Sequence, residues 1–295
     1  MVYKKTLGDH VFDAIVYILV AIVLIVTLYP LIYVFSMAIS NPIAAARGDV
    51  WLYPVGLDFT AVKKVLADPQ VLTYYGNTLW YTAVGTFCGV ITTALCAYPL
   101  SRKEFLSRKL VTKLVMVTMF FNGGIIPTYI VVSRFLHLYN SRWAIVTVML
   151  TTAWYIMITK SFFESLPDEL IESARLDGAS EYRIFGQMIL PLSKPILAVL
   201  TLYMVVGHWN SYFDAMLYIT DKLKQPLALY IRAVVIQNRL ASAMSNTVAL
   251  SAEEILAALQ IKYAVIIVSV LPMLIIYPFI SKNLEKGLMI GAVKG

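Results

Sequence analysis

The residues that most often perform chemistry are sparse in this chain and are not spaced for catalysis. Cys88 and Cys96 lie eight residues apart in one apolar stretch, which excludes a disulfide between them on a helix. His10, His137 and His208 fall in separate segments and form no zinc-binding HExxH arrangement. The sequence also lacks the Gly-rich loop, ending in Gly-Lys-Ser or Gly-Lys-Thr, that cradles nucleotide phosphates. We therefore expect no metal site, no bound cofactor and no enzyme activity in this chain.

Charge is instead concentrated in one segment, residues 160–194, which lies between two long apolar stretches. At about 2.5 to 3.5 kcal/mol for each charge at bilayer depth, burying this segment in lipid would cost on the order of 20 kcal/mol or more. It must therefore lie in water. Its charged residues are Lys160, Glu164, Asp168, Glu169, Glu172, Arg175, Asp177, Glu181, Arg183 and Lys194.

The chain as a whole is more apolar than a soluble domain of 295 residues needs to fill a core. Hydrophobic residues make up 60 % of it and charged residues 14 %, and the mean hydropathy is +0.76. A helix of roughly 20 apolar residues crosses the bilayer, so we predict an all-α membrane protein with six transmembrane helices, the first of them retained rather than cleaved as a signal peptide. The uncharged runs that predict them are 14–46, 69–101, 114–133, 143–159, 195–213 and 263–281.

The distribution of Lys and Arg predicts the orientation. The segments on one side of the membrane carry their Lys and Arg residues sparsely. One short connection on the other side holds five of them: Arg102, Lys103, Arg108, Lys109 and Lys113. By the positive-inside rule, both termini and the charged segment 160–194 then lie in the cytoplasm. This bias also explains the net charge of +7, so we expect a lipid bilayer and no nucleic acid as the partner of the basic residues.

The charged segment has the signals of a helical hairpin. Ser165 and Asp168 resemble a capping box, which predicts a helix from Leu166 to Leu176 that Gly178 ends. Ser180 then caps a second helix that runs through Met188. The apolar contacts expected of this hairpin are Leu170, Ala174, Tyr182, Ile184 and Phe185.

The same hairpin resembles the EAA loop of bacterial ABC importer permeases, whose pattern is EAA, three residues, G, nine residues, I, any residue, LP. Ser173 replaces the second residue of the pattern and Met188 replaces the Ile, and both changes are small in size or polarity. The positions that match are Glu172, Ala174, Gly178, Leu190 and Pro191.

Three further stretches resemble the carbohydrate importers of this family. Ala97 to Arg102 (AYPLSR) and Gly287 to Gly295 (GLMIGAVKG) are similar to the MalG-like permeases. Phe121 to Tyr129 (FNGGIIPTY) looks more like the LplC and YtcP branch and the alginate importer's permease, which are associated with larger or acidic saccharides. The resemblance implies a MetI/MalG-like permease fold and an oligosaccharide as cargo, possibly an acidic one that contains uronate.

A type I ABC importer of this kind implies several partners. A second permease subunit would complete the translocation path as a heterodimer, and two ATPase subunits would hold the ATP and Mg²⁺. An extracytoplasmic binding protein would deliver the sugar, and the complex would lie in the bacterial inner membrane. The residues that the resemblance assigns to ATPase coupling are Glu172, Ser173, Ala174, Arg175, Asp177, Gly178, Phe185, Leu190 and Pro191, with Gly287, Gly291 and Lys294 as a C-terminal contact.

The chain then divides into three parts. We expect residues 1–68 to hold the N-terminal cytoplasmic segment, the first transmembrane helix and an outer loop. Residues 69–281 would form the permease core of five transmembrane helices, with the hairpin 160–194 inside and the loop 214–262 outside. Residues 282–295 would form a cytoplasmic tail.

The end of the fifth predicted span is rich in aromatic and amide side chains, which suit stacking on sugar rings and hydrogen bonds to hydroxyls. Membrane-interface anchoring of the aromatic residues is the alternative. The candidate residues of the substrate path are Asn122, Tyr129, His208, Trp209, Asn210, Tyr212 and Asp214. The loop around Gln237 to Thr247 is expected, by resemblance, to reach the binding protein, and Ser251 with Glu254 predicts a helix that leads into the sixth span.

Two other classes of function are the alternatives. An ion-coupled secondary sugar carrier generally needs ionisable groups near the midplane of the membrane, and the six predicted spans hold no carboxylate or lysine there. A membrane scaffold without transport activity would use the hairpin only to recruit a partner.

Glycines also predict two structural features. Gly85 and Gly89 predict the close approach of another helix, and Gly123 with Gly124 predict that the third span can bend.

Overall fold

The computed structural model describes residues 6–244, 256, 259–276 and 278, and no strand occurs among them. The all-α prediction is confirmed. The chain forms two compact units: one combines residues 6–68 with the described part of 233–270, and the other combines 69–232 with the described part of 271–295. The second unit contains the hairpin and most of the predicted path.

The first unit begins with the long helix α1 (Leu7–Ala38). The helix starts earlier than the predicted run because the Thr6 hydroxyl accepts a hydrogen bond from the Asp9 N–H (3.3 Å), while the Asp9 carboxylate accepts one from the Thr6 N–H (2.7 Å). It ends at Ala38 rather than at residue 46, because Asn41 caps the short helix α2 (Pro42–Arg47). Most apolar side chains of α1 are exposed in this chain, as a helix in lipid or against another subunit requires.

A short irregular segment follows α1 and is held by side-chain hydrogen bonds. The Ser40 hydroxyl donates to the Ser36 carbonyl (2.5 Å) and accepts from the Val55 N–H (3.1 Å). The Gln260 amide, at the start of the helix Leu259–Ile276, donates to the Ser40 carbonyl (2.7 Å). Helix α3 (Thr60–Ala67) completes this part of the unit.

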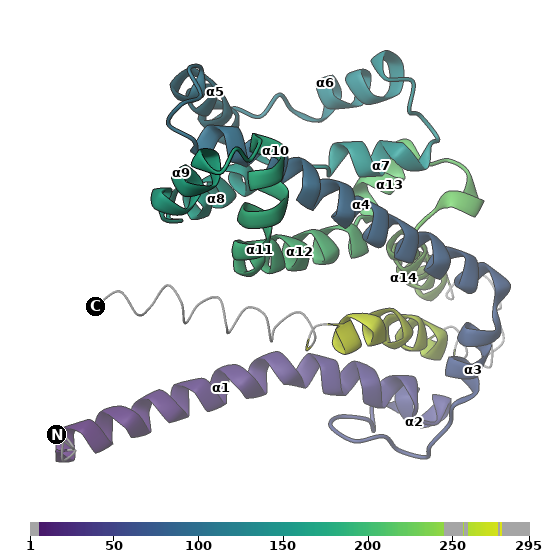
Figure 1. Cartoon of the computed structure of the whole chain (residues 1–295). Coiled ribbons are helices and arrows are strands. Elements are labelled where there is room, and N and C mark those ends of the chain that lie inside the picture. Colours follow the sequence, from purple (N-terminus) through teal and green to yellow (C-terminus); the bar gives the residue numbers. More distant parts are fainter. Residues whose placement is uncertain (1–5, 245–255, 257–258, 277, 279–295) are drawn as a thin grey trace. The chain divides into compact units, whose positions relative to one another are not determined.

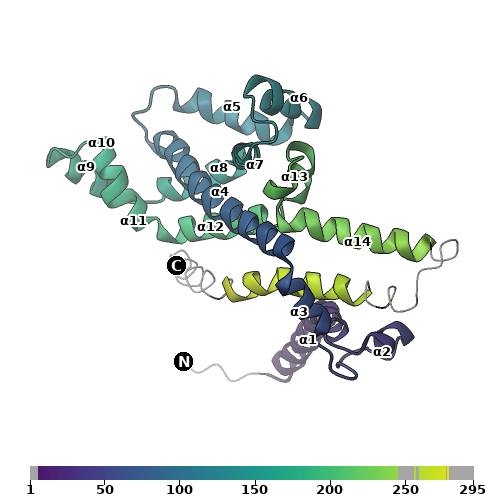
Figure 2. The ribbon, with the colours of Figure 1, turned by 90° about the vertical axis from the view of Figure 1, so that its right-hand side faces the viewer.

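The second unit is built on α4 (Pro69–Ser101), a straight run of 33 residues (Figure 1). Helix α12 (Lys194–Trp209) runs beside it (Figure 2). A Cβ atom placed on Gly85 would lie 2.4 Å from the His208 ring, and one on Gly89 would lie 2.7 Å from the Met204 sulfur. The close approach predicted from Gly85 and Gly89 is confirmed, because only a residue without a side chain fits there.

Two of the predicted spans, the third and the fourth, are helix pairs bent at a short break. The third consists of α5 (Arg108–Phe120) and α6 (Ile125–Ile130), which continues in a π-helix to Phe135, with a bend of 114°. Gly124 has a φ of +86°, and its N–H donates to the Asn122 side chain (2.9 Å), so the third span is bent at the two glycines.

The fourth span breaks in the same manner, and a further bend separates the hairpin from α12, which lies in the fifth predicted span. Helix α7 (Arg142–Val148) meets α8 (Ala153–Glu164) at 55°, and the segment Glu181–Leu192 meets α12 at 78°. Together with α1, α4 and the helix Leu259–Ile276, these pairs give up to six segments that can cross a membrane, the predicted number. The remaining elements are α13 (Tyr212–Tyr218), a 3-10 turn (Lys222–Lys224) and α14 (Leu227–Met244).

The contact between Gly85 and His208 can be tested by adding one methyl group. Gly85→Ala is expected to lower the stability of the detergent-solubilised protein by about 1 to 3 kcal/mol, because the His208 ring must shift. Thermal unfolding monitored by intrinsic fluorescence would measure this. Gly76→Ala in the same helix meets no atom within 4 Å and should stabilise by up to about 1 kcal/mol.

A rescue variant guards against a trivial explanation. The double variant Gly85→Ala, His208→Ala removes the ring that the methyl group meets. Its loss of stability should be smaller than the sum of the losses in the two single variants. Strictly additive losses would contradict the proposed contact.

Candidate functional site: the charged hairpin at the end of α4

The hairpin, residues 168–192, has the predicted shape with different boundaries. Helix α9 (Asp168–Leu176) is followed by a turn in which Gly178 has a φ of +76°, so the predicted break at Gly178 is confirmed. The predicted capping box is wrong: Pro167 precedes the helix without a side-chain cap, and the Ser165 hydroxyl donates back to the Phe162 carbonyl (2.7 Å).

The second arm of the hairpin is longer than predicted. Ser180 accepts a hydrogen bond from the Arg183 N–H (3.4 Å) and so caps α10 (Glu181–Ile184), as expected. The helix then passes through a π-turn, Phe185–Ile189, into α11 (Leu190–Leu192) rather than ending at Met188. Pro191 lies in the first turn of α11, where a missing N–H is tolerated, so the break comes at Ser193 instead.

An apolar core joins the hairpin to α4 and α8. Ile171, Ile184 and Ile189 are at most 3 % exposed and pack with buried residues of α4 and with Phe163. Ala174 and Phe185 pack against the same cluster, and with Ile184 they confirm three predicted contacts. The prediction is wrong for two residues, Leu170 and Tyr182, which are 41 % and 88 % exposed, because Ile171 and Ala174 define the inward face of α9.

Arg175 links the hairpin to the end of α4 by hydrogen-bonded ion pairs. Its guanidinium donates to Glu104 Oε1 (2.8 Å), just beyond α4, and to Glu181 Oε1 (2.9 Å) at the start of α10. The second oxygen of Glu181 accepts a hydrogen bond from the Tyr98 hydroxyl in α4 (2.7 Å). The hydrogen bond from Arg175 lowers the pKa of the Glu104 carboxyl, and the same contact raises the pKa of Arg175.

A second set of contacts lies at the same end of α4. Arg102 is 7 % exposed, lies 5.4 Å from the Tyr98 ring centroid and donates to the Phe163 carbonyl (2.7 Å). Lys103 pairs with Asp168 at the start of α9 (2.7 Å), which lowers the pKa of the Asp168 carboxyl. Because Lys103 and Asp168 are largely exposed, their pair adds little stability, and the buried Arg102 contributes more to the connection.

Several apolar and acidic side chains of the hairpin are exposed. Leu176 and Tyr182 are each 88 % exposed, and Glu172, Ser173 and Asp177 are also exposed. No ion pair involves Glu172 or Asp177 within the part of the chain that the structure describes. The hairpin is therefore held to α4 and α8 and still exposes apolar and acidic side chains.

The predicted path residues are not gathered into one site. Asn122 stabilises the break before α6, and Tyr129 stacks on Tyr218 with ring centroids 5.7 Å apart. His208 is 1 % exposed and lies against Gly85, so it fills the α4–α12 contact. Asn210 donates to the carbonyl of Val206 (2.9 Å).

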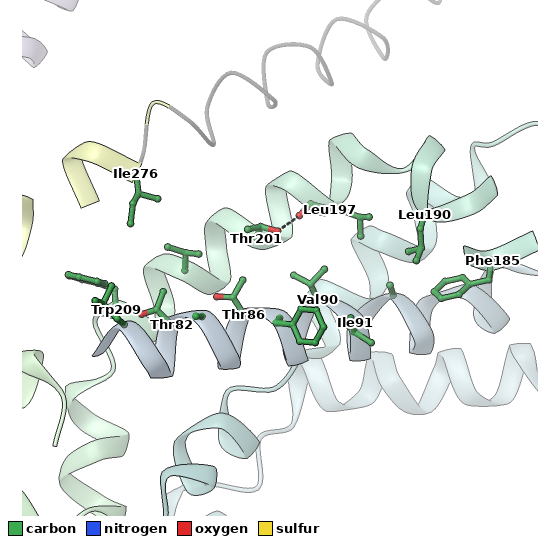
Figure 3. Close-up of a pocket in the computed structure, with 15 residues that line it drawn as sticks. Thr82, Thr86, Val90, Ile91, Phe185, Leu190, Leu197, Thr201, Trp209 and Ile276 are labelled. Carbon is green, nitrogen blue, oxygen red and sulfur yellow. Dashed lines mark hydrogen bonds between the residues drawn. The ribbon is translucent and has the colours of Figure 1, made fainter. Parts of the chain in front are cut away.

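Trp209 lies at one end of a cavity of about 580 Å³ between α4 and α12 (Figure 3). The cavity is lined mainly by apolar residues, and its polar groups are threonine hydroxyls. Thr201 donates to the Leu197 carbonyl (2.7 Å), whereas the buried hydroxyls of Thr82 and Thr86 have no hydrogen-bond partner among the residues that the structure describes. Three hydroxyls on an apolar wall provide few of the polar groups that a sugar needs.

The remaining path residues lie beyond the end of α12. Tyr212 is 42 % exposed and contacts Arg232 of α14 through its ring face, while Asp214 is half-buried in α13. Sequence reasoning did not single out Arg232.

Some predicted features fall outside the described residues. The C-terminal contact residues Gly287, Gly291 and Lys294 and the capping pair Ser251 and Glu254 are among them. Of the segment from Gln237 to Thr247, the part up to Met244 belongs to α14, and its helical backbone alone is described.

Comparison with known proteins identifies the family. The family model described as binding-protein-dependent transport system inner membrane component matches residues 2–290. The chain belongs to this family. It is thus a permease component of a membrane transport system that works with a binding protein.

Relatives and a solved structure agree with this membership. The chain is 37 % identical to the protein LplC of Bacillus subtilis strain 168 over 293 residues, covering 99 % of this chain and 97 % of that protein. It is 32 % identical over 288 residues to the polygalacturonan/rhamnogalacturonan transport system permease protein YtcP of the same strain, covering 97 % and 99 %. A crystal structure of a bacterial ABC transporter involved in the import of the acidic polysaccharide alginate has a TM-score of 0.84 and 33 % identity, covering 95 % of this chain and 99 % of that one.

The permease fold and the suspected relationship to LplC, YtcP and the alginate importer are therefore confirmed. Sequence reasoning found the hairpin residues of this permease but missed their partners Tyr98, Lys103 and Glu104. The stretch AYPLSR resembles the family at the end of α4. The polar residues in it and directly after it were the available signal that this end of the helix has partners.

The Arg175 connection predicts a local change in exchange. Arg175→Gln should speed amide hydrogen exchange across residues 168–192 about fivefold, because the partly exposed ion pairs with Glu104 and Glu181 contribute roughly 1 kcal/mol after solvent screening. Exchange measured by mass spectrometry in detergent or nanodiscs would show this.

Arg183→Gln is the matched control. Arg183 donates to Gln187 within the hairpin itself (3.0 Å), so this variant removes the same charge without touching α4. Equal acceleration in both variants would show that Arg175 does not fasten the hairpin.

Proposed function

We propose that this permease imports an oligosaccharide, specifically an acidic one that contains uronate, in an ATP-driven transporter of a bacterial cell membrane. The observation that carries this proposal is the pair of near-full-length relatives above 30 % identity, YtcP and the alginate importer, whose names specify acidic polysaccharides. By contrast, the maltodextrin permease MdxG of Bacillus subtilis strain 168 is 29 % identical.

The exposed apolar and acidic side chains of the hairpin form the proposed docking surface for an ATPase subunit. Leu176 and Tyr182 would enter an apolar groove, and Glu172 and Asp177 would meet basic residues there. Because α9 and α10 are held to α4 by Arg175 and by the apolar core, a displacement of the hairpin moves α4 with it. ATP hydrolysis on the partner is thereby converted into movement of the spans.

The other assignments of the resemblance complete the proposal. The N- and C-termini and the hairpin face the cytoplasm, and the loop 214–262 faces the binding protein. The partners are a second permease subunit and two ATPase subunits, which hold the ATP and Mg²⁺. Gly287, Gly291 and Lys294 provide a further ATPase contact, and residues 1–68, 69–281 and 282–295 remain the proposed parts of the chain.

A secondary carrier is the rival from another class. Its coupling ion needs an acidic or basic side chain within the spans, and α4, which lies along the central cavity, contains no Asp, Glu, Lys or Arg. This composition favours energy supplied from outside the bilayer.

Reconstituted transport separates these possibilities. Proteoliposomes that contain this chain, its partner subunits and internal ATP should accumulate an oligogalacturonate or an alginate oligosaccharide when the binding protein is added outside. Internal ADP or an ATPase variant without its phosphate-binding lysine should abolish accumulation. Uptake driven by a proton or sodium gradient without ATP would refute the proposal in favour of a secondary carrier. The absence of uptake of any saccharide would refute it in favour of a scaffold.

The docking surface has its own test. Leu176→Asp should reduce both recovery of the ATPase with the purified permease and ATP-driven uptake by tenfold or more, because a carboxylate replaces an apolar contact of the interface. Leu106→Asp is the control, since Leu106 is fully exposed near the same end of α4 but outside the hairpin. Normal association of Leu176→Asp with the ATPase would refute docking through this face.

A further inference from the structure

An exposed arginine lies on an aromatic ring at the end of the unit opposite the hairpin. The Arg232 guanidinium carbon lies 5.6 Å from the centroid of the Tyr212 ring, and its Nη1 is 2.8 Å from the Met216 sulfur. Tyr212 is 42 % exposed and Met216 is 40 % exposed, so the stacked pair faces outward. The Tyr212 ring fixes the plane of the guanidinium and leaves its other donors free.

Two other cations of this end already have partners. Arg142 donates to the Asn77 side chain (2.7 Å) and lies 5.5 Å from the Trp80 ring centroid. Lys224 pairs with Asp221 (3.3 Å) and donates to the Asn140 carbonyl (3.1 Å). These two side chains hold the loop before α14 in place.

Arg232 differs from these two side chains because it is exposed. No ion pair of Arg232 occurs among the residues that the structure describes, and Asp214, a half-buried acid of the neighbouring α13, does not pair with it. An arginine that only anchored α14 to α13 would gain more from a carboxylate partner than from a thioether sulfur. The arrangement therefore presents a pre-oriented cation to an anion from outside the chain.

The chemistry of the pair specifies that anion. A guanidinium binds a carboxylate through two parallel hydrogen bonds, and an aromatic ring stacks on the apolar face of a sugar. We propose that Arg232 and Tyr212 form a binding site for the uronate carboxylate of an acidic oligosaccharide as it enters the permease. The inference rests on the proposed function, and it makes Arg232 the residue that distinguishes acidic from neutral cargo.

The test uses the complete transporter in proteoliposomes, with uptake measured for the acidic oligosaccharide that the wild type carries, oligogalacturonate or oligoalginate. Arg232→Gln should raise KM by about tenfold, the loss of one charged contact, with kcat changed much less. Arg232→Lys keeps the charge but not the planar fork of donors, so its KM should lie between those of wild type and Arg232→Gln. The binding protein is a separate chain, so its affinity for the saccharide is unchanged.

Arg134→Gln is the matched control, since Arg134 is another exposed arginine whose loss removes one charge without an aromatic support. Its KM should stay within twofold of wild type. An equal rise in KM for Arg134→Gln and Arg232→Gln would overturn the site in favour of a diffuse charge effect. An unchanged KM for Arg232→Gln would overturn it outright.

Lipid phosphate is the other anion that a guanidinium could bind. The measurements are therefore repeated in vesicles of phosphatidylcholine alone and of phosphatidylcholine with phosphatidylglycerol. An effect of Arg232→Gln that disappears without phosphatidylglycerol would assign Arg232 to lipid and overturn the proposal. If the wild-type transporter imports acidic oligosaccharides and Arg232→Gln imports them equally well, only the Arg232 site is refuted. If the wild-type transporter imports none, both the site and the proposed cargo are refuted.

Discussion

The close approach of α12 to α4 at Gly85 is the contact on which the rest of the permease core depends. The His208 ring occupies the space that a side chain at Gly85 would fill, and Met204 does the same at Gly89. Lipid tails are as apolar as the helix surfaces, so helices in a membrane are held together by such close packing rather than by burial from water. This contact also defines the cavity that Trp209 closes at one end, because α4 and α12 form its two walls.

Helix α4 connects the two ends of the unit as a single rigid element. At one end Tyr98 bonds to Glu181 of the hairpin and Arg102 bonds to Phe163 of α8, and at the other Asn77 donates to the carbonyls of Leu223 (2.8 Å) and Gln225 (3.0 Å) in the loop before α14. Tyr81 adds a third such bond to the Lys224 carbonyl (2.8 Å). Movement imposed on the hairpin is thus carried along 33 residues of helix to the loop that precedes Arg232.

Polar side chains in this permease are used mainly for positioning. Asn122 stabilises a helix break, His208 fills a helix contact and Asn210 bonds to its own helix, so residues that looked suited to sugar recognition serve the fold. The pattern follows from the cost of an unpaired polar group in an apolar medium, which is met by the nearest backbone carbonyl or N–H. Polar groups without such partners, among the exposed residues of the hairpin and at Arg232, are the ones available to other molecules.

The sequence by itself determined the helical fold, the apolar helices long enough to span a membrane and the Gly178 turn, because each follows from a local property: hydropathy over about 20 residues and the φ angles open to glycine. Only the tertiary structure decided that Arg175 meets Glu104, 71 residues away, that Ile171 rather than Leu170 is buried, and that Tyr212 lies under Arg232. Those pairings depend on the angles at which helices cross and on where each bent span breaks. No local pattern encodes such angles, since they arise from the packing of side chains that are distant in sequence.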